Sequence, residues 1–137
     1  MTFEAALISE LAAAIPALGG RIYPVSAPEA NRNGGTPYAI VVSSEGLRDK
    51  TLDGYMDSKS VPGEINIIAP SYSTVRAITK QVVALLIGME QRTIGSDGPF
   101  IEELTYEQPV ELYEEKPDMY RCLIEFTAYF DEEGSNP

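Results

Sequence analysis

The segment from Met119 to Phe130 alternates between two kinds of side chain, and this alternation constrains the fold more than any other feature of the sequence. In a β-strand, successive side chains point to opposite faces of the sheet. One face here would be apolar, made of Tyr120, Cys122, Ile124, Phe126, Ala128 and Phe130. The other would be half polar, made of Met119, Arg121, Leu123, Glu125, Thr127 and Tyr129. The pattern predicts a long strand with one face in the core.

Two segments carry apolar residues at helical spacing. Thr2 is a suitable N-cap for a helix that Pro16 would end, with Phe3, Leu7, Ile8, Leu11 and Ile15 on its apolar face. Ser71 or Ser73 would cap a second helix that ends near Gly88, with Val75, Ile78, Val82, Leu85, Leu86 and Met89 on its apolar face.

The remaining apolar runs predict short strands over residues 21–23, 38–44, 64–69, 100–107 and 111–113, with a loop over 24–37 and a turn over 116–118. Residues 45–62 are either a long loop or a twisted hairpin that projects from the body. Because strands cluster and helices stand apart, we expect an α+β fold with a mainly antiparallel sheet and two helices packed on one face. The other face is left partly apolar, so something must cover it.

The length of 137 residues suits one domain, which we expect over 1–130, followed by a flexible acidic tail over 131–137. The longest apolar stretch, Val82 to Ile87, is far shorter than the roughly 20 residues of a membrane span. We expect no membrane association and no signal peptide.

Residue types that carry catalysis are scarce. The chain has no histidine, so it lacks the commonest general base and metal ligand. Cys122 lies mid-strand and is better explained as a core thiol. Glu102-Glu103 and Glu114-Glu115 are adjacent, and on a strand adjacent side chains point to opposite faces, so neither pair could flank a bond. We therefore expect no catalytic residues, no cofactor, no metal and no enzymatic activity.

The net charge of −11 is uneven, with −3 over residues 1–70 and −8 over residues 71–137. Such a surface repels nucleic-acid phosphates and anionic membranes, although solubility alone also explains it. Residues 45–62 mix these charges with Leu47, Leu52, Tyr55 and Met56. An interaction arm would use such apolar residues as anchors, whereas an ordinary loop would not need them.

Several short motifs in order form a recognisable layout. These are Gly-Gly-Arg-Ile-Tyr-Pro (19–24), Thr-Pro-Tyr-Ala-Ile-Val-Val-Ser (36–43), Leu-Asp-Gly (52–54), Gly-Glu-Ile-Asn-Ile-Ile-Ala (63–69) and Pro-Ser-Tyr-Ser (70–73), before the closing strand. The layout resembles the tail-terminator, or tail-completion, proteins of long-tailed bacteriophages and prophages. The resemblance covers nearly the whole chain.

The resemblance implies a structural virion subunit that forms a ring, as a homohexamer, at the head-proximal end of the tail. The ring would cap the major tail tube protein, stop tube polymerisation and provide the docking face for a head connector or stopper protein. DNA would pass through the lumen without specific binding, and acidic side chains lining the bore would help it to slide. Assembly would take place in the host cytoplasm.

By the same resemblance, contacts with the tube or connector fall on Arg48, Lys50, Leu52, Tyr55 and Met56. Two alternatives stay open: a related neck or minor tail component of similar fold, and an acidic soluble module that binds a basic protein.

Overall fold

The computed structural model describes residues 1–25, 35–114 and 119–131. The expected loop over 24–37, the turn over 116–118 and the acidic tail fall wholly or mostly outside these ranges. The elements are α1 (Phe3–Ala14), a 3-10 turn η1 (Pro16–Leu18), β1 (Ile22–Pro24), β2 (Tyr38–Ser43), β3 (Leu47–Thr51), β4 (Gly54–Ala69), α3 (Tyr72–Gly88), β5 (Arg92–Thr93), β6 (Phe100–Tyr106), β7 (Val110–Glu114) and β8 (Met119–Asp131).

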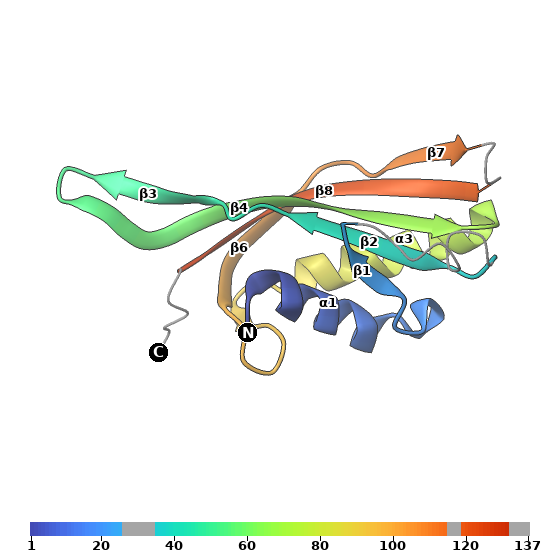
Figure 1. Ribbon diagram of the computed structural model, residues 1–137, viewed down its shortest axis with the longest axis horizontal. Helices are drawn as coiled ribbons and strands as arrows, with labels where there is room; N and C mark the ends of the chain where they lie inside the picture. The colour runs from blue at the N-terminus through green and yellow to red at the C-terminus, as the bar shows by residue number, and fades with distance from the viewer. Residues whose placement is uncertain (26–34, 115–118, 132–137) are drawn as a thin grey trace.

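The strands form one sheet in the order β1-β2-β4-β8-β6-β5, with β3 paired to β4 and β7 paired to β8. All pairings are antiparallel except that of β1 with β2. Both helices lie on the same side of the sheet (Figure 1). The α+β class, the antiparallel sheet and the placement of the helices are therefore confirmed.

Strand β8 lies at the centre of the sheet and behaves as its alternation predicts. Cys122, Ile124, Phe126, Ala128 and Phe130 are buried in the main core, with Tyr120 packed against its edge. Met119 is also buried, in a smaller cluster on the opposite face. The strand continues through Asp131, one residue beyond its expected end.

Strand β4 corrects one prediction, because it begins at Gly54 and runs without interruption to Ala69, whereas the sequence favoured a strand over 64–69 only. Pro62 lies inside this strand, although a proline has no amide hydrogen to donate to a neighbouring strand. In the structure the backbone amide of Ser44 donates to the carbonyl of Pro62 at 3.1 Å. In an antiparallel pair the nitrogen and the carbonyl of one residue point toward the same neighbouring strand, so the nitrogen of Pro62 points toward the segment between β2 and β3. No strand in that segment needs a hydrogen bond from this nitrogen, and a proline is therefore tolerated here.

The helices begin where their capping residues place them. The Thr2 hydroxyl accepts a hydrogen bond from the amide of Ala5, and the Ser71 hydroxyl accepts one from the amide of Thr74. Ser71, rather than Ser73, is therefore the cap of α3. Phe3, at the start of α1, stacks on Phe130 of β8 with ring centroids 5.3 Å apart.

A polar clip holds α1 to the segment after α3. Glu10 accepts hydrogen bonds from the Arg92 guanidinium at 2.8 and 3.0 Å and from the amide of Gly95 at 2.7 Å. The hydrogen bond from Arg92 is the largest influence, and it lowers the pKa of the Glu10 carboxyl. The clip fixes the packing of α1 beneath the sheet.

Candidate interaction surfaces

The hairpin formed by β3 and the first part of β4 projects away from the body of the molecule (Figure 1). We call residues 47–58 the arm. The prediction of a projecting hairpin within 45–62 is confirmed, and the alternative of a long loop is wrong. Every residue of β3 is exposed, and Leu52 at the tip is fully exposed (107%). An apolar side chain exposed to solvent at a hairpin tip has no role in the core of its own chain.

The five predicted contact residues all lie on the arm. Arg48 donates from Nε to the carbonyl of Met56 at 2.8 Å and pairs through Nη2 with Asp57 at 3.0 Å. The ammonium of Lys50 lies 5.0 Å from the centre of the Tyr55 ring. These contacts brace the two strands of the arm, and they leave Leu52, Tyr55 and Met56 exposed.

The root of the arm contains a residue whose role the sequence did not reveal. Lys59 is one of the charged residues of 45–62, yet its side chain is only 7% exposed. Its ammonium donates to the carbonyl of Glu45 at 2.9 Å and to the Glu45 carboxylate at 3.3 Å, and it lies 5.7 Å from the Phe130 ring centre. Lys59 thus ties the connection between β2 and β3 to the body. Lys59 shares a face of β4 with Val61 and Ile65, and in a continuous strand this alternation indicates burial.

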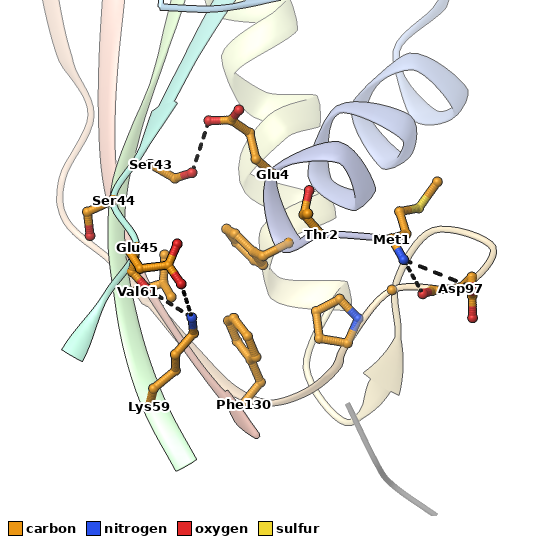
Figure 2. Close-up of a pocket in the computed structure, with 13 residues that line it drawn as sticks. Met1, Thr2, Glu4, Ser43, Ser44, Glu45, Lys59, Val61, Asp97 and Phe130 are labelled. Atoms are coloured by element: carbon orange, nitrogen blue, oxygen red, sulfur yellow. Dashed lines mark hydrogen bonds and ion pairs between the residues drawn. The ribbon is translucent and has the colours of Figure 1, made fainter. Parts of the chain in front are cut away.

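A pocket of about 830 Å³ opens beside this root, between the start of α1, the connection after β2 and the loop around Asp97 (Figure 2). Ser43 donates to the Glu4 carboxylate at 3.1 Å, and the amino group of Met1 donates to the Asp97 carbonyl at 3.1 Å. These contacts join neighbouring elements across the pocket.

The sheet face turned away from the helices, which we call the open face, is apolar at one end. Tyr38, Ile68 and Met119 form a small buried cluster there, with Tyr23 and Ile40 packed against it. On the neighbouring strand β7, Val110 and Leu112 are 50% and 47% exposed. The expectation of a partly apolar second face is met within the described residues.

Other chemically relevant groups occupy ordinary positions. Cys122 is buried, and burial is the main cause that raises the pKa of its thiol. The pairing of β6 with β8 shifts register between Ile101 and Glu103. The strict alternation used to separate Glu102 from Glu103 therefore does not apply, and both are exposed. Across the described ranges, no group of three acidic or cysteine side chains is arranged to hold a metal ion, and no helix is long and apolar enough to cross a membrane.

Comparisons with known proteins give a family from the sequence and a fold from solved structures. The sequence matches the family described as "Tail completion protein gp17" over residues 5–131. A chain from the structure described as "Virion of native gene transfer agent (GTA) particle" has a TM-score of 0.71 and 19% identity, covering 94% of each chain. A second solved chain has a TM-score of 0.53 and 15% identity, covering 98% of this chain and 92% of its own. A search of curated proteins found no match. At these identities the structural matches establish a shared fold.

Proposed function

This chain belongs to the tail completion protein gp17 family, and from that premise we propose that it forms a ring that caps the head-proximal end of a phage tail tube. The family makes it a structural tail component, as the layout of its sequence motifs indicated. In the proposed role the ring stops polymerisation of the major tail tube protein and provides the docking face for a head connector or stopper protein. A chain of the same fold occurs in a gene transfer agent virion, which supports a place in a virion.

The observation that carries the proposal is the arm. It projects from the body and presents Leu52, Tyr55 and Met56 to solvent, among the charges of Arg48 and Lys50. Exposed apolar anchors surrounded by polar groups are typical of protein–protein contacts. We assign the contact with the tube or the connector to these five residues.

The half-exposed Val110 and Leu112 beside the open face support a contact with a neighbouring copy. A contact between two different surfaces of identical subunits generates a ring when the rotation closes, and we propose a hexamer. The net charge of −11 suits a lumen through which DNA slides without binding. In this role the protein has no catalytic residue and no cofactor. It acts at the head-proximal end of the virion tail after assembly in the host cytoplasm.

Electron microscopy of tail tubes assembled with and without the protein tests the proposal. We expect tubes of defined length with a ring at one end when the protein is present, and overgrown tubes without it. Identical lengths and ends in both samples would contradict a terminating role. A ring that leaves tube length unchanged would instead indicate a neck or minor tail component.

Two substitutions test the arm. Leu52→Ser and Tyr55→Ser remove side chains that are 107% and 65% exposed, so the free energy of unfolding should change by less than about 0.5 kcal/mol. Capping of tubes should be lost, because the apolar anchors are removed. Val25→Ser, which truncates another exposed apolar residue outside the arm, serves as the control and should cap normally. Normal capping by both arm variants would show that the arm does not make this contact.

A further inference from the structure

We propose that, in the ring, the open face of one subunit packs against the outer side of α3 in the next copy of the same chain. The inference rests on the proposed ring and adds the pair of surfaces that would hold it together. Each surface is described by its own residues, and the two differ in charge.

The open face combines apolar residues with unpaired carboxylates. Next to the apolar end described above, Glu64 of β4 lies directly opposite Glu125 of β8 in the strand register. Like charges in this position destabilise a sheet unless water or a cation compensates them. Within the described part of the chain, neither carboxylate forms an ion pair. The face therefore favours a partner that brings apolar and cationic side chains together.

The outer side of α3 has this composition. Between Tyr72 and Gly88 the helix contains no acidic residue, in a chain with 21 of them. Its buried stripe is Val75, Ile78, Val82 and Leu86, so the opposite stripe, at helical spacing, is Ser73, Ala77, Lys80, Ala84 and Ile87. Lys80 is exposed, and Ile87 is 56% exposed. Small residues on either side of Lys80 allow another surface to approach the helix backbone closely.

The placement of the two surfaces suits a ring. The open face and α3 lie on opposite sides of the sheet (Figure 1). A contact between them is head-to-tail, so each copy keeps one surface of each kind available for the next neighbour. Lys80 would meet Glu125 and Glu64, and Ile87 would meet the apolar end around Leu123 and Val110. A second copy of this chain supplies a cation to these two carboxylates and covers the exposed apolar residues.

Cross-linking tests the contact directly. Lys80→Cys protein is mixed with Glu125→Cys protein, each carrying Cys122→Ala, and the mixture is allowed to cap tail tubes before mild oxidation. We expect a covalent dimer of the two variants. A mixture of Lys80→Cys with Glu102→Cys, which places the thiol at another exposed glutamate, should give none.

Charge reversal supplies a second readout. Lys80→Glu and Glu125→Lys should each raise the concentration needed for ring formation by about tenfold, because each places like charges together. The protein with both reversals should recover to within about threefold of the original. Glu102→Lys makes the same charge change away from the contact and should assemble normally. Circular dichroism verifies that each variant is folded.

The outcomes separate the contact from the ring. Rings that form without the Lys80–Glu125 cross-link, or a double reversal that assembles no better than the single ones, would overturn the contact and leave the ring intact. Absence of any ring on tubes capped by the unmodified protein would overturn both. A cross-link together with recovery by the double reversal supports the contact.

Discussion

Replacing Glu10 with glutamine tests whether the clip between α1 and the segment after α3 stabilises the fold. The carboxylate accepts two hydrogen bonds from Arg92 and one from the amide of Gly95, at 2.7 to 3.0 Å. Glutamine has a similar shape and can still accept one hydrogen bond. It removes the negative charge, so Arg92 loses its ion-pair partner and keeps only neutral acceptors such as the Gly88 carbonyl.

The expected cost follows from this geometry. Hydrogen bonds to charged groups contribute roughly 1.5–3 kcal/mol each, but the pair is partly screened because the Arg92 side chain is 41% exposed, against 17% for Glu10. We therefore expect Glu10→Gln to lower the free energy of unfolding by about 2 kcal/mol at pH 7. For a chain of this length that corresponds to a fall in Tm of about 8 °C.

The effect should also depend on pH in a defined direction. Because the hydrogen bond from Arg92 lowers the folded-state pKa of Glu10, the carboxylate stabilises the fold fully at pH values above the unfolded pKa. The stabilisation is lost as the pH falls through the lower, folded pKa. Urea unfolding of both proteins at several pH values between 3 and 7, the range set by the ordinary glutamate pKa of about 4.3, measures the difference.

A matched control removes general effects of charge. Glu102→Gln makes the same change at an exposed glutamate of β6 and should alter the free energy of unfolding by less than about 0.5 kcal/mol. If Glu10→Gln behaved like this control at pH 7, or if its cost were the same at pH 3 as at pH 7, the clip would not be a stabilising ion pair.

Two further predictions concern the root of the arm and the core. Gly46→Ala should cost about 2 kcal/mol or more in urea unfolding, because φ is 89° there and the new Cβ would lie 2.5 Å from the Ser60 carbonyl oxygen. Gly54→Ala, at φ 117° with open space around it, should cost less, and equal costs would exclude the steric cause. Cys122 should react with a maleimide only after unfolding, since burial raises its pKa; rapid labelling of the native protein would contradict its place in the core.

The helices and strands that could be predicted from the sequence are those with one side packed in the main core and the other side exposed. Alternation along β8 identified its buried side chains, and Thr2 marked the start of α1, because both signals depend on local geometry and on a single apolar layer. The same logic identified α3, although two serines competed for its cap. Only the geometry of the Ser71 hydroxyl decided between them.

The sequence left a hairpin and a long loop as equal alternatives for the arm, because its strands pack against no core. Without burial, the side chains of Leu52 and Tyr55 follow no period that separates a strand from a loop. Burial of Lys59 depends on pairing with residues distant in sequence, among them Phe130. The resemblance to a family pointed to the five candidate contact residues, and the structure shows that they lie together on the exposed arm.

The continuity of β4 has a mechanical consequence. At about 3.3 Å per residue, its 16 residues form a rod of about 50 Å from the tip of the arm to Ala69, two residues before the cap of α3. From Ser58 to Ala69 the rod is hydrogen-bonded along its length to β8. The arm therefore cannot swing at its root without breaking bonds in the middle of the sheet. A force applied to the tip of the arm at Leu52 is therefore transmitted along β4 into the central sheet.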